Sequence, residues 1–446
     1  MATFARLTGR VVAGAGVLAL SPVLGLATLA GMAMVGAEPT AFAVTGLAVF
    51  ASMFFLGLLL CVPRPRVAWG RWLRAVVVLG VEAAVVWQVS VATLRPAPSH
   101  TSLAPVAGQR EWRLPTGSEL AYVRLAPKRV TRPDPVVFLH GGPGVADLAA
   151  SSAFFGKLAA DGYQVYVYDQ LGAGRSARLR DPRGYGLTRD VQDLEAIRQA
   201  MGAGRLNLIA QDYGAQLAAA YLAAHPDRVA RTVLSSPAGL SQRASTASVL
   251  ASPSDPSQGS STATFSASPT EPSQGAPAWE PQARGTDGKV EAAAVFGRDG
   301  TPDPRLLAIS TLLRVDPRAA HAFAGDRELD AYLDLVRRRA PHPCPAAATG
   351  SGGYVGLSGR AAPGSLRLSL TKATAPVLIV KGQCDEQSWA SAMEFQRALP
   401  SATLAYLGGS TYQSERYLGL LRAFLAGRPV PAYEGQGPPS GYRGPA

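Results

Sequence analysis

The chain has 446 residues, 47% of them hydrophobic, which is enough for about two or three structural units. Its 43 Lys and Arg residues exceed its 31 Asp and Glu residues, giving a net charge of +12. The arginines are dispersed, and no run of basic residues with interleaved aromatics occurs. This charge therefore favours a membrane surface and argues against nucleic acid as a partner.

The N-terminal part contains few acidic residues and three apolar runs, at 11–36, 41–62 and 75–94. Each run has about the 20 residues that are needed to cross roughly 30 Å of hydrocarbon. We therefore expect residues 1–98 to form a membrane anchor of three transmembrane helices, with the lipid bilayer as a partner. A cleaved signal peptide is the alternative for the first run, but no Ala-x-Ala site separates it from the second.

Lys and Arg residues in the short loops predict the orientation of this anchor. Arg6 and Arg10 precede the first run, whereas Glu38 stands alone between the first and the second. Four more arginines separate the second run from the third: Arg64, Arg66, Arg71 and Arg74. We therefore expect a multi-pass protein of the cell membrane with a cytoplasmic N-terminus and an extracytoplasmic soluble domain.

Strands and helices alternate along the next part of the chain. Two alternating segments within 111–125 flank a Pro-Thr-Gly-Ser turn and predict a β-hairpin. Helical periodicity over 188–201 predicts a helix with Asp193 and Glu195 facing solvent. Continuous apolar runs predict buried parallel strands at 135–139, 163–168, 206–210 and 229–234. The order of these elements predicts an α/β protein with a doubly wound, mostly parallel sheet.

Residues 242–288 break this pattern, because Ser, Pro, Ala, Thr and Gln dominate and large apolar residues are almost absent. Such a composition cannot bury enough apolar surface to fold, so we predict a disordered insert. Helical periodicity returns within 289–370, which we predict to be a helical lid.

Two further strands, predicted at 376–380 and 403–407, return the chain to the sheet. The α/β core therefore has a first part at 105–241 and a second part at 371–428. A tail rich in Pro and Gly follows at 429–446.

Three motifs follow the ends of predicted strands: His-Gly-Gly-Pro-Gly at 140–144, Asp-Gln-Leu-Gly-Ala-Gly-Arg-Ser at 169–176, and Gln-Asp-Tyr-Gly at 211–214. In this order and spacing they resemble the α/β-hydrolase fold, and within it the proline iminopeptidase group, over roughly residues 107–428. The resemblance implies a hydrolase sheet with a helical lid and an activity of the aminopeptidase or esterase type. Its substrate would be a small molecule or a peptide.

The resemblance also implies positions for the site residues. In this fold the loop glycines let backbone N–H groups approach a developing oxyanion, while a tight elbow lifts a side chain over the sheet. The elbow position falls on Asp212, the acid position on Asp385, and the region of the family's histidine on Thr411. The oxyanion hole would use Gly142 and Tyr213, supported by His140, Gly141, Pro143 and Gly144.

The sequence departs from this family in two places, because Asp212 replaces the expected serine and no histidine follows residue 342. An aspartate at the elbow is the nucleophile in epoxide hydrolases and haloalkane dehalogenases, but release of the resulting ester needs a base. His321 or His342 of the lid is a candidate, whereas His225 is expected to be a structural cap. The alternative is a non-catalytic homologue, or pseudoenzyme, that binds a partner protein or a small cationic ligand at an anionic site.

Two of the three cysteines, Cys344 and Cys384, belong to the soluble part. If this part lies outside the cytosol, a disulfide between them is expected, and a free thiol at Cys384 is the alternative. No His, Cys or Asp cluster has the spacing of metal ligands, so we expect neither a metal nor another cofactor.

Overall fold

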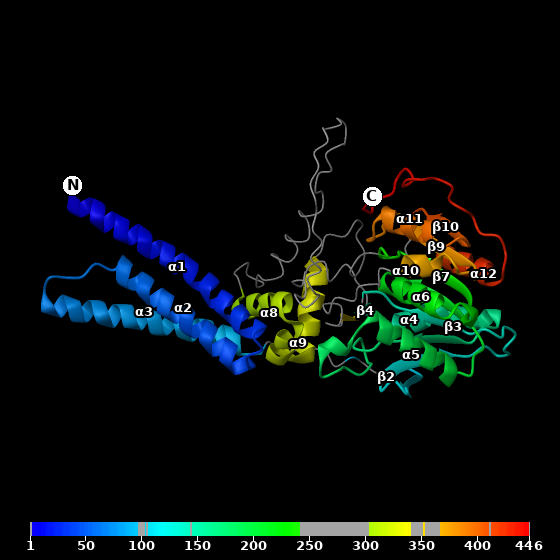
Figure 1. Cartoon of the computed structure of the whole chain (residues 1–446), viewed down its shortest axis with the longest axis horizontal. Coiled ribbons are helices and arrows are strands. Elements are labelled where there is room, and N and C mark those ends of the chain that lie inside the picture. Colours follow the sequence, from blue (N-terminus) through cyan, green and yellow to red (C-terminus); the bar gives the residue numbers. More distant parts are fainter. Residues whose placement is uncertain are drawn as a thin grey trace, which may run out of the picture.

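The computed structural model describes residues 2–96, 103, 106–142, 145–240, 303–339, 351–352, 366–409 and 412–445. Long N-terminal helices occupy one side of the molecule and an α/β domain the other (Figure 1). Helices α8 (Pro304–Val315) and α9 (Pro317–Arg339) of the predicted lid lie between them (Figure 1). The insert predicted at 242–288 lies outside the described residues.

Helices α1 (Ala2–Met34), α2 (Pro39–Cys61) and α3 (Ala68–Leu94) are each long and apolar enough to cross a membrane. The three predicted spans are thereby confirmed as candidates, although α3 begins before residue 75. Arg74 belongs to this earlier part of α3, and its guanidinium donates to the Val62 and Leu59 carbonyls, 3.0 and 2.9 Å away, at the end of α2.

Glycine allows α1 and α2 to pack closely. A Cβ atom added at Gly46 of α2 would lie 2.9 Å from the Gly25 carbonyl oxygen of α1. Small residues at such contacts let two backbones approach, which is typical of helices that associate in a membrane.

The α/β domain is built on an eight-stranded sheet of order β1-β2-β5-β3-β6-β7-β9-β10. The strands are β1 (Gln109–Arg113), β2 (Glu119–Leu125), β3 (Val136–Leu139), β5 (Val165–Tyr168), β6 (Leu206–Gln211), β7 (Val229–Ser235), β9 (Val377–Gly382) and β10 (Ala402–Leu407). Strands β1 and β2 form the predicted hairpin, and β2 pairs with β5 in the antiparallel sense. The other pairs are parallel, so the predicted mostly parallel sheet is confirmed.

Helices cover both faces of the sheet, which explains the apolar runs. In β3, Val137 and Leu139 belong to one buried cluster, while Val136 and Phe138 belong to a second cluster on the opposite face. The first cluster includes α5 (Leu187–Ala200), α6 (Tyr213–Ala224) and α11 (Trp389–Ala398), and the second includes α4 (Leu148–Phe155) and α12 (Glu415–Leu425). Every residue of β3 is buried, as strands covered on both sides require.

The prediction that Asp193 faces solvent is wrong. Its carboxylate is buried and accepts hydrogen bonds from Thr116 Oγ1 and Ser118 Oγ at 2.5 and 2.8 Å. These donors lie in the turn between β1 and β2, so tertiary contact with the hairpin overrides the helical pattern. Glu195 is only partly exposed and accepts from Tyr221 Oη at 2.8 Å.

The lid contacts both the N-terminal helices and the α/β domain. Buried Arg305 of α8 pairs with buried Glu328 of α9 and donates through Nη1 to the Thr93 carbonyl oxygen of α3, 2.7 Å away. On the other side, Asp330 Oδ2 of α9 lies 2.5 Å from Arg178 Nη2 of the loop after β5. The short strand β8 (Ser351–Gly352) pairs with β4 (Val145–Ala146), directly after the predicted oxyanion loop.

The C-terminal tail packs back onto the edge of the sheet (Figure 1). The Tyr433 N–H donates to the Leu404 carbonyl oxygen of edge strand β10 at 2.7 Å. The Trp389 ring makes edge contacts with the Tyr433 and Tyr442 rings, with centroids 5.3 and 5.2 Å away. The tail thereby covers an otherwise open edge and reaches the loop after β9.

Candidate functional site

Asp212 occupies a sharp turn between β6 and α6. Its φ is 51° and its ψ is −113°, an uncommon conformation for a residue other than glycine. The turn has room because two glycines lie against it. A Cβ at Gly214 would lie 2.2 Å from the Leu139 carbonyl oxygen, and one at Gly141 would lie 2.8 Å from Asp212 Cβ. This strand-turn-helix geometry is that of a nucleophile elbow.

The carboxylate of Asp212 is hydrogen-bonded at both oxygens. Oδ2 accepts from the Gly142 N–H at 2.7 Å, and Oδ1 accepts from Gln387 Nε2 at 2.6 Å. The Tyr213 N–H also stabilises the charged form. The two N–H groups predicted for an oxyanion hole therefore act on the elbow carboxylate itself.

Desolvation raises the pKa of Asp212 to about 7, against the opposing hydrogen bond from Gly142. The negative charges of Glu386 and Asp385 contribute to this rise. Near neutral pH the Asp212 carboxyl group is thus divided between its protonated and ionised forms.

Asp385 lies in the loop after β9 and is buried. Its Oδ1 accepts from Ser236 Oγ and from the Gln387 N–H at 2.9 Å, while the buried Lys381 Nζ lies 3.0 Å away. Its Oδ2 accepts from Tyr412 Oη at 2.5 Å. Asp385 is therefore a paired carboxylate with several donors.

The Tyr412 hydroxyl lies beside Asp385, in the region where the family resemblance places a histidine. It accepts from the Gly382 N–H at 2.9 Å while donating to Asp385. Burial, with the Asp385 charge, raises the pKa of Tyr412 well above its usual value, so this phenol stays protonated near neutral pH. Thr411, the residue predicted for this region, lies outside the described residues, as do Pro143 and Gly144.

The fold and the elbow agree with a family match over residues 134–269, to the family described as alpha/beta hydrolase fold. The chain has the α/β-hydrolase fold. It is 38% identical over 103 residues to a proline iminopeptidase of Heyndrickxia coagulans, a match that covers 23% of this chain and 35% of that protein. It is 34% identical over 132 residues to a proline iminopeptidase of Lactobacillus helveticus, covering 28% of this chain and 43% of that protein.

This chain thus matches less than half the length of these curated relatives. Among solved structures it is similar to the crystal structure of a proline iminopeptidase from Mycobacterium smegmatis, with 20% identity and a TM-score of 0.43. That likeness covers 72% of this chain and 96% of the other.

In this α/β-hydrolase fold, both nitrogens of the His140 ring contact backbone groups of neighbouring loops. Its Nε2 accepts from the Gln170 N–H at 2.8 Å, so the proton lies on Nδ1, 3.0 Å from the Gly141 carbonyl oxygen. Gln170 Nε2 donates in turn to the His140 carbonyl oxygen at 2.8 Å. Both ring nitrogens are engaged, so His140 is unsuited to act as a base at the elbow.

The motif at 169–176 holds Gln170 in place. Asp169 Oδ2 accepts from the Arg175 N–H at 2.8 Å, and a Cβ at Gly174, whose φ is 50°, would lie 2.2 Å from the same oxygen. Desolvation raises the pKa of buried Asp169 to about 6, against the Arg175 hydrogen bond. The Asp-Gln-Leu-Gly-Ala-Gly-Arg-Ser signature is therefore structural support for the oxyanion loop.

The other histidines of the α/β-hydrolase and lid regions lie elsewhere. His225 follows α6, and its ring packs on the Tyr221 ring with centroids 4.9 Å apart. His321 Nε2 lies 3.0 Å from Asp326 Oδ1 within α9, so it pairs there rather than with an aspartate of the site. His342 lies outside the described residues.

Cys384, directly before Asp385, is disulfide-bonded, whereas Cys61 is free. The free-thiol alternative for Cys384 is therefore wrong. Its predicted partner Cys344 lies outside the described residues, and the pairing stays a prediction. Within the described ranges no group of three His, Cys, Asp or Glu residues is placed to hold a metal ion.

Sequence reasoning missed three residues at this site: Ser236, Lys381 and Gln387. Ser236 and Lys381 lie at the carboxyl ends of β7 and β9, where side chains of parallel strands converge. Because Lys381 Nζ lies 3.0 Å from Asp385, it compensates the charge of that carboxylate, and the site is less anionic than its two aspartates alone would make it. A polar residue at the end of an apolar strand was the available signal.

Proposed function

We propose that this protein is a membrane-anchored α/β-hydrolase homologue with a degenerate catalytic triad, which binds a ligand or a partner protein instead of hydrolysing a substrate. One observation carries this proposal: the Asp212 carboxylate accepts the Gly142 N–H, the group that an oxyanion would need. A substrate carbonyl would have to displace that carboxylate before it gained the same hydrogen bond.

The state of Asp212 also opposes nucleophilic attack. A nucleophile needs an ionised, reactive oxygen aimed at the substrate, but Gly142 and Gln387 each donate to one Asp212 oxygen, and such hydrogen bonds lower the nucleophilicity of a carboxylate. A pKa near 7 leaves much of the population protonated at neutral pH. Release of an ester would further need a base, whose help is worth about 10²–10⁴ in rate.

The membrane part of the proposal is supported by charge and by contacts. One end of α2 and α3 carries four arginines. Arg64 and Arg66 lie between the two helices, and Arg71 and Arg74 lie in the first turns of α3, which favours the cytoplasmic side for this end. Thr93, at the opposite end of α3, contacts the lid through Arg305. The α/β domain would then lie on the extracytoplasmic side of a multi-pass membrane protein.

A second candidate is a hydrolase of the aminopeptidase or esterase type. The pKa of Asp212, raised to about 7, favours it, because a group that titrates near neutrality is suited to general acid-base catalysis. The segment shared with two proline iminopeptidases has the same implication.

Turnover and adduct formation distinguish the two candidates. The full chain in lipid nanodiscs would be incubated with aminoacyl arylamides, esters and epoxides, and followed by product release and by intact-protein mass. Asp212→Asn removes the titrating group, and Asp181→Asn changes an exposed aspartate elsewhere. We expect all three proteins to match empty nanodiscs. Turnover that is present in the wild-type chain and in Asp181→Asn but lost in Asp212→Asn would establish a hydrolase. A single trapped adduct without turnover would show attack by Asp212 without release, and the protein would not be a hydrolase.

A further inference from the structure

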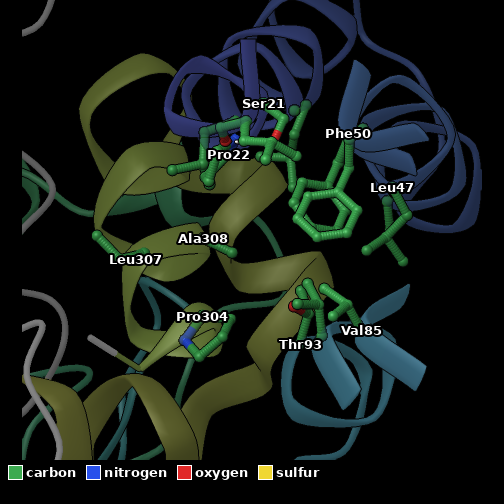
Figure 2. Close-up of a pocket in the computed structure, with 17 residues that line it drawn as sticks. Ser21, Pro22, Leu47, Phe50, Val85, Thr93, Pro304, Leu307 and Ala308 are labelled. Atoms are coloured by element: carbon green, nitrogen blue, oxygen red, sulfur yellow. Dashed lines mark hydrogen bonds between the residues drawn. The ribbon is translucent and has the colours of Figure 1, made fainter. Parts of the chain in front are cut away.

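A cavity of about 360 Å³ lies between helices α1, α2, α3 and the lid helix α8. Figure 2 shows Leu47 and Phe50 of α2 and Val85 of α3 across from Leu307 and Ala308 of α8. This volume falls within the range of roughly 300–1,000 Å³ that small-molecule sites occupy. Elements that are far apart in the sequence thus build one site.

The cavity walls are almost entirely apolar, and Ser21 and Thr93 are the polar residues among those that line it. Pro22 has no N–H to donate to the Leu18 carbonyl oxygen, but Ser21 Oγ does so at 2.8 Å. At the far end, the Thr93 carbonyl oxygen accepts from Arg305 Nη1. A ligand there gains contact surface rather than hydrogen bonds, which favours a hydrocarbon.

The cavity lies in the half of the helix bundle that faces the α/β domain. Its lining runs from Leu18 to Leu29 in α1, which ends at Met34, and reaches Thr93 at the last turn of α3. At about 1.5 Å per residue, these residues lie within roughly 25 Å of the lid-facing helix ends. Leu47 and Val85 remain partly exposed, so hydrocarbon around the bundle has access from the side.

We propose that this cavity binds one acyl chain of a membrane lipid, drawn from the leaflet next to the α/β domain. An acyl chain matches the walls, whose surface is almost entirely apolar, and the surrounding bilayer is its source. The inference rests on the proposed membrane location of α1 to α3 and is independent of any activity of Asp212. A bound chain would touch Leu307 and Ala308, and so would report directly to the lid.

Photo-crosslinking tests this site, because α8 lies outside the candidate membrane spans. The full chain would be placed in phosphatidylcholine nanodiscs that contain a phospholipid with a diazirine in its acyl chain. A parallel sample would contain a diazirine fatty acid at the same chain concentration. After irradiation, peptide mass spectrometry would locate the labels. We expect the phospholipid to label α8 at Leu307 or Ala308, in addition to the lipid-facing Trp72 and Trp87.

A matched pair of variants makes the test quantitative. Val85→Phe fills the cavity, whereas Val76→Phe makes the same change on the same helix at a side chain that is 64% exposed. We expect Val85→Phe to lower α8 labelling roughly tenfold, since it excludes about two methylene groups, while Val76→Phe leaves it unchanged. Labelling of the unmodified chain, and its loss on addition of unlabelled lipid, are measured first and need no variant.

Three results would overturn the proposal. Labels at Trp72 and Trp87 without any on α8 would mean annular lipid only, and the membrane location would stand. Labels on α8 from the fatty acid alone would rule out a membrane lipid as the source. Absence of label from all of α1 to α3 would remove the membrane location and the site together.

Discussion

Asp212 and Asp385 are carboxylates at the same edge of one sheet, after β6 and after β9, yet they are held in opposite ways. Asp385 is the more deeply buried, and Lys381 Nζ lies 3.0 Å from it. Asp212 has amide donors but no cation among its hydrogen-bond partners in the described part of the chain, and its pKa is raised to about 7. The free-energy cost of burying a carboxylate therefore depends on the charge of its partner as well as on the depth of burial.

The largest effect is expected when Asp385 loses its cation. Lys381→Met leaves a buried carboxylate unpaired, so the free energy of unfolding should fall by about 3–5 kcal/mol, measured by urea denaturation of the full chain in detergent. The control is Lys157→Met, which breaks an exposed pair with Glu415 at 2.6 Å and should cost far less, because solvent screens exposed charges. Equal losses in the two variants would show that Asp385 does not depend on Lys381.

The next effect concerns Asp212 and the pH dependence of the free energy of unfolding. Because its folded-state pKa of about 7 exceeds the ordinary value of 3.8, the unfolded chain releases this proton first as pH rises. The wild-type chain should therefore lose stability relative to Asp212→Asn between about pH 4 and pH 7, by up to about 1.4 kcal/mol per pH unit. Above pH 7 the difference should be constant.

Denaturation at a series of pH values checks this prediction. Asp181→Asn is the control, because hydrogen bonds from Arg183 lower the pKa of Asp181 to about 2. The contribution of Asp181 is lost as pH falls from about 4 to about 2, outside the window of Asp212. Parallel curves for the wild type and Asp212→Asn from pH 4 to pH 7 would contradict the raised pKa.

A smaller effect is expected at the hydroxyl beside Asp385. Tyr412→Phe removes one donor to a charged acceptor, so it should cost about 1.5–3 kcal/mol of the free energy of unfolding. Tyr163→Phe is the matched control, because its hydroxyl donates at 3.0 Å to the neutral Leu425 carbonyl oxygen and should cost about 0.5–1.5 kcal/mol. A loss at Tyr412 no larger than that at Tyr163 would mean that the other partners of Asp385, including Lys381, stabilise it without the phenol.

The smallest effect concerns the tail, which contacts the loop after β9. In this loop Gln387 donates hydrogen bonds to both aspartates. The Tyr442 hydroxyl donates to the Gln387 carbonyl oxygen at 3.1 Å, so Tyr442→Phe should cost about 0.5–1.5 kcal/mol in the same urea assay. Tyr433→Phe removes an exposed hydrogen bond within the tail, to the Gly437 carbonyl oxygen, and should cost less. A greater loss at Tyr433 would show that the tail stabilises itself rather than the loop.

The sequence predicted the sheet and the elbow because their signals are local. Each buried strand is a short apolar run, and the elbow is a four-residue motif, Gln211 to Gly214, between a strand and an Ala-rich helix. The order of these elements then leaves few arrangements for the sheet.

The charge balance of the site was not predictable in the same way. Ser236 and Tyr412 reach Asp385 from loops 149 and 27 residues away along the chain. Lys381 lies near the end of the apolar strand β9, where a lysine first suggests exposure to solvent rather than a buried ion pair. The partners of Arg305 include a carbonyl oxygen 212 residues away, which no local pattern indicates.

The contact between Arg305 and the Thr93 carbonyl oxygen has a mechanical consequence. In a bilayer, thickness sets the tilt of a helix such as α3, and any tilt that displaces Thr93 must break this hydrogen bond or move α8 with it. Glu328 and Asp330 lie two residues apart on α9, so the same movement reaches Arg178 in the α/β domain. One hydrogen bond and two ion pairs thus connect α3 to the α/β domain through the lid helices.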